Sequence, residues 1–298
     1  MVDLSYSTSC FKEHQLAPAL DAIAAAGFRC IEFAIDTHAS EDRPGRFAAA
    51  ASRELEGRGM RATTVHGPAR TNVLGAPDET WRKEKVEVLA DALRFCGQLG
   101  AAGMVIHGIP NPMFLPKDQE QRSLYEPMVA AMKQSVEDLI PVSAATGVRL
   151  LLENLPYNCD LEQFDGVGSI GGGGGDYPLM KIVQLRAFIE EFPPDQVGLV
   201  IDTGHAWTEG TDPVGEIEAA GDRLWGTHLQ DVDAARPADN HWVPTHGGLN
   251  WDRILAALQR INYRGTYTFE VINNRHGETP EQLAQLTYEV ARGWNLPD

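Results

Sequence analysis

The sequence predicts an α/β fold, a single (β/α)8 barrel over residues 1–298. Short β-rich apolar segments alternate with helical patterns along the whole chain, and there are eight of each. Four of the predicted strands also end on an acid or a histidine, at Glu153, Asp202, His228 and Glu270. The carboxyl ends of parallel barrel strands converge on one face, where active sites form. The length of 298 residues suits one such domain, since these barrels typically have about 250 residues.

Strands and helices are expected in strict alternation. The predicted strands begin near Leu4, Cys30, Ala62, Met104, Val148, Val197, Arg223 and Gly265. The predicted helices span residues 17–26, 46–57, 78–99, 119–145, 179–191, 213–221, 250–261 and 280–293. Pro280 follows a Thr279 cap and lies in the first turn of the last helix, where proline is tolerated. Because no glycine-rich phosphate loop follows the first strand, an open doubly wound sheet is disfavoured.

The composition disfavours several classes of partner. The chain has 25 Lys and Arg against 42 Asp and Glu, a formal net charge of −17. An acidic surface without a basic run repels phosphate backbones, so no nucleic-acid partner is expected. The four cysteines lie far apart, which predicts neither a disulfide framework nor a thiolate cluster. We find no secretory signal and no apolar run of about 18 residues, so a cytoplasmic location without a membrane partner is expected.

The strand-end acids and histidines predict a metal site. Glu153, Asp202, His228 and Glu270 are a mostly oxygen-donor set, which suits Mn²⁺ first, with Mg²⁺, Co²⁺ or Zn²⁺ as alternatives. Other residues of ligand type lie at or just beyond strand ends: His66, His107, His205, Asp239 and His241. Burying such groups unpaired costs on the order of several kcal/mol each, and a shared cation removes that cost.

Short motifs, in the same order along the chain, resemble those of a known superfamily. They are Val65-His66-Gly67-Pro68, Leu152-Glu153-Asn154, Asp202-Thr203-Gly204-His205-Ala206, His228-Leu229-Gln230-Asp231, Asp239-Asn240-His241, Phe269-Glu270-Val271 and the stretch from Pro244 through Asn250-Trp251. Over nearly its whole length the chain looks like the xylose-isomerase-like TIM-barrel superfamily of sugar isomerases and epimerases, including the sugar phosphate isomerase/epimerase family. This superfamily also contains the endonuclease IV type of abasic-site DNA repair enzyme. The resemblance implies a small-molecule sugar substrate and a homodimer or homotetramer.

The resemblance to keto-sugar 3-epimerases also implies a mechanism for a metal-dependent isomerase. One divalent ion would be held by Glu153, Asp202, His228 and Glu270, and would stabilise the enediolate formed when a carbon-bound proton leaves. Glu153 and Glu270 would remove and return a proton on opposite faces of that carbon. His205 would bind substrate oxygens or serve as a secondary acid.

Two other activities stay open. Endonuclease IV binds three zinc ions through nine ligands, and the corresponding positions here all hold residues of ligand type: His66, His107, Glu153, Asp202, His205, His228, Asp239, His241 and Glu270. Dehydratases with the same metal cage are the second alternative. Missing basic loops and the sugar-like stretch from Pro244 to Gly248 favour the sugar enzyme. The lack of clustered basic residues favours an unphosphorylated keto-sugar or related polyol ketone.

Several residues around the expected site have less defined roles. Trp207, Asn154 and His246 are expected at the substrate, and Asp231 and Asp239 could orient His228 and His241. Glu32, within the second predicted strand, reaches the site or pairs with a neighbouring strand. Arg223 begins the seventh predicted strand and is expected to be structural.

A glycine-rich active-site loop is expected at about 156–178, where Gly171–Gly175 is a run of five glycines. It follows the strand that ends at Glu153. It either closes over the substrate or is a tolerated surface insertion.

Overall fold

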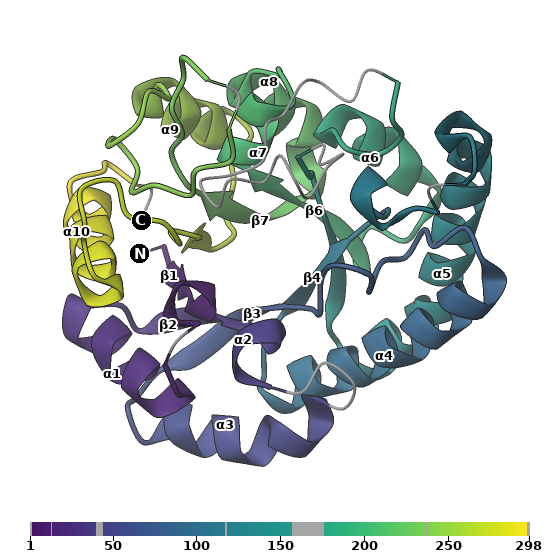
Figure 1. Cartoon of the computed structure of the whole chain (residues 1–298). Coiled ribbons are helices and arrows are strands. Elements are labelled where there is room, and N and C mark those ends of the chain that lie inside the picture. Colours follow the sequence, from purple (N-terminus) through teal and green to yellow (C-terminus); the bar gives the residue numbers. More distant parts are fainter. Residues whose placement is uncertain are drawn as a thin grey trace.

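The computed structural model describes residues 2–12, 14–39, 44–116, 118–156, 176–236 and 238–296. Within these ranges, eight parallel strands close into a barrel whose order follows the chain, with β1 beside both β2 and β8 (Figure 1). The strands are β1 (Leu4–Ser7), β2 (Cys30–Ala34), β3 (Arg61–His66), β4 (Gly103–His107), β5 (Arg149–Glu153), β6 (Val197–Asp202), β7 (Leu224–Leu229) and β8 (Tyr267–Phe269). The predicted fold class is confirmed, and every strand begins within two residues of its predicted start.

Helices surround the strands on the outside of the barrel (Figure 1). They are α1 (Leu16–Ala26), α2 (Ile35–His38), α3 (Ala48–Glu56), α4 (Glu79–Gln98), α5 (Tyr125–Thr146), α6 (Ile182–Phe188), α7 (Thr203–Thr208), α8 (Pro213–Ala220), α9 (Trp251–Arg260) and α10 (Pro280–Arg292). The short helices α2 and α7 were not predicted, because four to six residues carry too little periodicity to be recognised. Among the described residues, no helix combines the length and the apolar character needed to cross a bilayer.

The helix predicted over 119–145 begins later than expected. A 3-10 turn over Gln121–Leu124 precedes α5, which starts at Tyr125. This start puts Pro127 in the first helical turn, where its missing N–H has no helical partner to lose. A start at residue 119 would have put the same proline in the helix interior.

The barrel interior is built in layers. One layer is a small apolar cluster on neighbouring strands that consists of Val105, Leu151, Val200 and the partly buried Trp225. Side chains two residues apart on a strand point to the same side. Two residues beyond the first three members of this cluster come His107, Glu153 and Asp202. The predicted ligands therefore form the layer next to the apolar one, at the carboxyl ends of the strands.

The glycine-rich loop predicted at about 156–178 falls mostly on residues 157–175, including Gly171–Gly175, which lie outside the described residues. Its role stays a prediction.

Candidate metal centre

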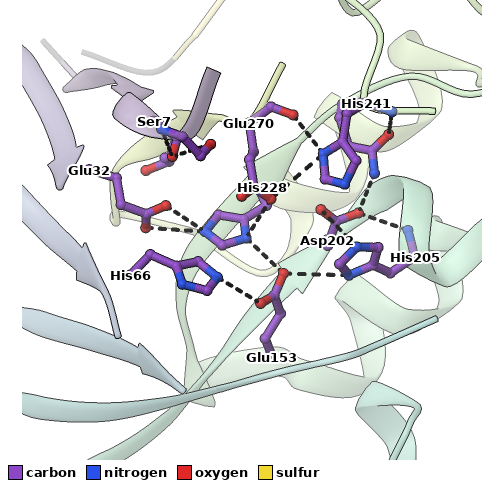
Figure 2. Close-up of polar contacts among 12 residues, drawn as sticks. Ser7, Glu32, His66, Glu153, Asp202, His205, His228, His241 and Glu270 are labelled. Carbon is purple, nitrogen blue, oxygen red and sulfur yellow. Dashed lines mark hydrogen bonds and ion pairs between the residues drawn. The ribbon is translucent and has the colours of Figure 1, made fainter. Parts of the chain in front are cut away.

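Four buried side chains form the centre of the site. The donor atoms of Glu153, Asp202, His228 and Glu270 all lie within 4.8 Å of one another. His228 Nδ1 lies 2.7 Å from Glu153 Oε1 and 3.4 Å from Glu270 Oε2. Figure 2 shows Glu153 and Glu270 on the Nδ1 side of the His228 ring and Glu32 on the other side. The strand-end set predicted from the sequence is thus brought together.

This group has the properties of a divalent-cation site. Four donors about 2.1 Å from one ion stand roughly 3–4 Å apart, which is compatible with the observed spacing. Among the described residues, the buried atoms Glu153 Oε2 and Asp202 Oδ2 have no hydrogen-bond partner. A buried carboxylate oxygen that accepts no hydrogen bond is costly, and a cation would satisfy both. Three carboxylates and one imidazole suit Mn²⁺ or Mg²⁺ better than softer metals.

Asp202 ends β6 and begins α7, and its backbone is fixed by Asn154. The Asn154 Oδ1 accepts the Asp202 N–H at 2.7 Å, and Asn154 Nδ2 donates to the Asp202 carbonyl at 3.0 Å. Asp202 Oδ1 caps α7 by accepting the His205 N–H at 2.8 Å. Since both ends of the Asn154 amide bind the β6 backbone, Asn154 positions a ligand here, and its contact with substrate stays a prediction.

A second buried group consists of Asp202, His205 and His241, whose donor atoms also converge. Asp239 Oδ2 lies 3.3 Å from His205 Nε2 and 3.1 Å from His241 Nε2. His205 Nδ1 lies 2.9 Å from the Asn154 carbonyl. Asp239 thus contacts His241, as the sequence predicted, and also faces the nitrogen with which His205 would bind a ligand.

Gln230 ties the first group to the second. Its Nε2 donates to Asp202 Oδ1 at 3.1 Å and to Asp239 Oδ1 at 2.7 Å, while its Oε1 accepts the His241 N–H at 2.9 Å. A Cβ atom at Gly204 would lie 2.2 Å from this amide, so glycine leaves the space that Gln230 fills. Gln230 lies in the motif that begins at the end of β7, but no role for it was predicted from the sequence.

A third group consists of His66, His107 and Glu153. Glu153 Oε2 lies 3.7 Å from His66 Nε2 and 3.5 Å from His107 Nε2. Glu153 is therefore shared with the first group, as Asp202 is shared between the first and second. All nine predicted ligand-type residues lie in this connected network.

The carboxylates hold positive charge on the imidazoles. Burial disfavours the charged ring of His66, but Glu153, Glu270 and Glu32 outweigh it and raise the pKa of His66 to about 9. Burial also disfavours the charged ring of His241, but its carboxylate neighbours outweigh burial and raise the pKa of His241 to about 10.

The pKa values of Asp202 and Glu153 shift in opposite directions. Burial, with Asp239 and Glu153 adding like charge, raises the pKa of Asp202 to about 6 despite the nearby histidines. Burial also acts to raise the pKa of Glu153, but three imidazoles outweigh it and hold that pKa well below its usual value. Glu153 is thus ionised at neutral pH. A bound cation would replace the protons that now balance these carboxylates.

Three residues predicted near the reacting groups lie elsewhere or have other contacts. Asp231 does not orient His228: its carboxylate accepts the N–H groups of Val232, Thr245 and Leu249 and the Trp251 indole. It anchors the loop between β7 and α9 instead. Trp207 lines a cavity of about 640 Å³ near the starts of α8 and α9. The His246 N–H donates to the Val243 carbonyl, and substrate contact by Trp207 and His246 stays a prediction.

Glu32 reaches the site across the barrel from β2. Its oxygens lie 3.0 and 3.1 Å from His228 Nε2, and Thr64 Oγ1 donates to Oε2 at 2.9 Å. The sequence left open whether Glu32 reaches the site or pairs with a neighbouring strand, and the structure has both. Arg223, as expected, is structural: it is buried and donates to the Val197 and Ile189 carbonyls.

The chain also matches known proteins. A sequence model described as a xylose isomerase-like TIM barrel matches residues 20–292. The chain belongs to this family. The family resemblance predicted from the sequence is confirmed.

Individual relatives are more distant. The chain is 27% identical over 224 residues to the uncharacterized protein y4fM of Sinorhizobium fredii, covering 74% of this chain and 63% of that protein. It is 36% identical over 94 residues to the D-psicose 3-epimerase of Enterocloster bolteae, covering 32% of this chain and 29% of the epimerase. The chain thus spans less than two thirds of both relatives.

A solved structure described as a D-tagatose 3-epimerase-like protein superposes with a TM-score of 0.75 at 20% identity, covering 97% of this chain and 96% of the other. At this identity the likeness shows a shared fold alone.

Proposed function

We propose that this chain is a divalent-metal-dependent isomerase that epimerises an unphosphorylated keto-sugar or related polyol ketone. The observation that carries the proposal is the convergence of Glu153, Asp202, His228 and Glu270, in which both glutamates reach His228 Nδ1 (Figure 2). The match to a D-psicose 3-epimerase and the shared fold with a D-tagatose 3-epimerase-like protein support the substrate class.

The metal set would be Glu153, Asp202, His228 and Glu270, and Mn²⁺ is the ion that its donors fit best. When bound, the ion would stabilise negative charge that develops on the substrate oxygens. One glutamate accepts the proton from the carbon beside the carbonyl, and the C–H electron pair moves into the enediolate. The other glutamate delivers a proton to the opposite face, which inverts that carbon.

His205 is proposed as a hydrogen-bonding group or secondary acid for the substrate. Its Nδ1–H donates to the Asn154 carbonyl, which leaves Nε2 directed toward Asp202 and Asp239. A substrate hydroxyl would therefore approach His205 through Nε2 in competition with these carboxylates.

The preference for an unphosphorylated substrate rests on charge. Within the described part of the chain, the polar contacts of the four proposed ligands and of His205 involve no lysine or arginine. A phosphate would meet an acidic network instead of the basic groups that usually bind it.

The decisive experiment follows solvent hydrogen. Protein loaded with Mn²⁺ is incubated in D₂O with D-psicose, D-tagatose and their phosphorylated counterparts. We expect a C3-epimer that carries one deuterium at the inverted carbon, from the unphosphorylated sugars only. A product without deuterium would exclude proton transfer through an enediolate, and a dehydrated product would assign the dehydratase alternative.

A second candidate, a three-metal phosphodiester hydrolase of the endonuclease IV type, is favoured by one observation. The three converging groups share Glu153 and Asp202 and include six further residues of ligand type with Asp239 bridging two histidines. Elemental analysis of protein purified without added metal separates the two functions. One ion per chain supports the epimerase, whereas three zinc ions together with incision of abasic duplex DNA would replace it.

A further inference from the structure

Glu32 is a buried carboxylate in the middle of β2, and its side chain is 1% exposed. A carboxylate in a barrel interior costs several kcal/mol, on the order expected for any unpaired buried charge, unless specific partners satisfy it. Its partners are Thr64 of β3, whose Oγ1 donates to Oε2 at 2.9 Å, and His228 of β7. Both Glu32 oxygens lie close to the same atom, His228 Nε2, at 3.0 and 3.1 Å.

The two nitrogens of His228 face different carboxylates. Nδ1 faces Glu153 and Glu270, at 2.7 and 3.4 Å, while Nε2 faces Glu32 (Figure 2). In a neutral imidazole only one nitrogen carries a proton, and the other offers a lone pair. Without a cation, each nitrogen has a carboxylate that can accept its proton, since Glu153 lies 2.7 Å from Nδ1 and Glu32 lies 3.0 Å from Nε2. With a cation in the ligand group, the carboxylate fixed against Nε2 holds the ring proton on Nε2. That tautomer directs the Nδ1 lone pair at the ligand group.

Glu32 is separated from the ligand group by the imidazole ring. It is not among the residues whose donor atoms converge within 4.8 Å, whereas His228, Glu153 and Glu270 are. Its carboxylate therefore acts on the cation site through His228.

We propose that Glu32 is a positioning residue: it holds His228 as the Nε2–H tautomer and presents Nδ1 to the divalent cation. A carboxylate behind a ligating imidazole also increases the basicity of the ligand. This inference rests on the proposed function in one respect, that the four-residue group binds a divalent cation.

The test replaces Glu32 with glutamine. Glu32→Gln keeps the size of the side chain and its amide oxygen can still accept from His228, but the negative charge is gone. We expect the dissociation constant for Mn²⁺, measured by calorimetric titration, to rise about 10- to 100-fold. With saturating Mn²⁺, kcat should return to within a few-fold of wild type, because the groups that move the substrate proton are intact.

A spectroscopic readout separates positioning from packing. In the Zn²⁺-loaded protein, long-range ¹H–¹⁵N spectra of the imidazoles report which His228 nitrogen carries the proton. Wild type should show the Nε2–H form with the signal of a proton shared with a carboxylate, and Glu32→Gln should show the Nε2–H signal shifted toward that of a weaker hydrogen bond to an amide. A merely structural role for Glu32 would lower stability without changing the His228 signal.

Two further variants keep the test interpretable. Glu216→Gln changes another buried glutamate, on α8 and outside the three groups, and should leave the Mn²⁺ affinity unchanged. Thr64→Val removes the hydroxyl that holds Glu32 Oε2 and should weaken Mn²⁺ binding several-fold while leaving the charge in place. If Glu32→Gln does not fold, Thr64→Val decides: unchanged affinity would overturn the proposal.

The outcomes of these experiments separate the role of Glu32 from the proposed function. Wild-type protein that binds no divalent cation would overturn the proposed function and the role of Glu32 with it. Wild-type protein that binds Mn²⁺, with Glu32→Gln binding it equally well and an unchanged His228 spectrum, would overturn the role of Glu32 alone.

Discussion

Glu153 and Glu270 both reach His228, but their surroundings differ. Glu153 is 1% exposed and lies 2.7 Å from His228 Nδ1. Burial acts to raise the pKa of Glu153, but its imidazole neighbours outweigh burial and hold that pKa low. Glu270 lies 3.4 Å from the same nitrogen and its side chain is 9% exposed. A carboxylate with looser partners can turn toward a substrate at lower cost. Glu270 is therefore better placed to exchange a proton at each turnover.

This difference leads to a prediction for Glu270→Gln. The amide cannot accept a proton, so kcat should fall by about 10²–10⁴-fold in protein saturated with Mn²⁺. Steady-state kinetics with metal analysis of the same sample measure this. Glu289→Gln, on the exposed face of α10, serves as the control and should retain full activity. Activity within a few-fold of wild type in Glu270→Gln would remove Glu270 from the proton-transfer pair.

The raised histidine pKa values predict opposite pH dependences for metal-free and metal-loaded protein. In metal-free protein, His66 has a pKa of about 9 against an ordinary 6.5, so its protonated form stabilises the fold fully below about pH 6.5. That contribution is lost as the pH rises through about 9. His241 adds a loss that continues toward pH 10.

In the metal-loaded protein, a cation competes with these protons, so its affinity and the stability it confers should rise over the same range. Thermal denaturation from pH 6.5 to 9, with and without Mn²⁺, should give a melting temperature that falls with pH in the first case and a metal-induced increment that grows with pH in the second. Parallel curves would show that the imidazole protons and the cation do not compete.

At the scale of elements, the junction between β6 and α7 places Asp202 and His205 in the site. Asp202 is the last residue of the strand, the N-cap of the helix and a proposed ligand, so strand, helix and metal site share one carboxylate. Gly204 and Gln230 fit together beside it. The geometry of Asp202 therefore depends on how closely α7 approaches the residues after β7.

Gly204→Ala should disturb this junction. Its Cβ would lie 2.2 Å from the Gln230 amide, which binds Asp202 and the His241 backbone and cannot move freely. We expect a loss of about 1–3 kcal/mol in the free energy of unfolding, as for other overpacked sites, and weaker metal binding. Chemical denaturation measures the first and titration the second.

Gly215→Ala is the matched control for this substitution. Gly215 lies in helix α8 with no atom within 4 Å of an added Cβ, so alanine should stabilise by up to about 1 kcal/mol through helix propensity. If Gly204→Ala behaved like Gly215→Ala, the packing of Gln230 would not determine the geometry of Asp202.

At the scale of the whole molecule, the net charge of −17 limits the partners that the site can meet. The acidic surface repels the negatively charged backbone of a nucleic acid. Some of the arginines are also already paired with acids, in salt bridges such as Arg58–Asp21 and Arg260–Glu218. The connected groups of ligand-type residues would allow three metals, but this charge disfavours the substrate of such a site.

We therefore expect no measurable binding to abasic-site duplex DNA. Fluorescence anisotropy at a physiological ionic strength of about 0.15 M should give a dissociation constant weaker than about 10⁻⁴ M, the weak end of non-specific DNA binding. A basic DNA-binding protein of similar size is the control for the assay. Tight binding that weakens steeply with salt, or incision of the duplex, would favour the hydrolase.

The sequence alone determined the architecture and the chemical character of the site. Alternating strand and helix patterns predict a (β/α)8 barrel, because hydrophobic periodicity is a property of short segments and can be recognised in the sequence itself. The residues at strand ends could be identified for the same reason: a strand that stops on Glu153 or Asp202 places that side chain at the barrel mouth in any closed parallel barrel. Family motifs then ordered these residues into a ligand set.

Only the tertiary structure decided which atoms face one another. Glu32 and His228 are 196 residues apart and lie on strands that do not pair, so their contact depends on barrel closure. Asp231 follows His228 closely in the chain, yet it anchors a loop, because its carboxylate points at that loop's N–H groups. Local patterns encode which face of a strand a residue occupies. Contacts across the interior depend on the tilt and register of all the strands together, and these are properties of the closed barrel.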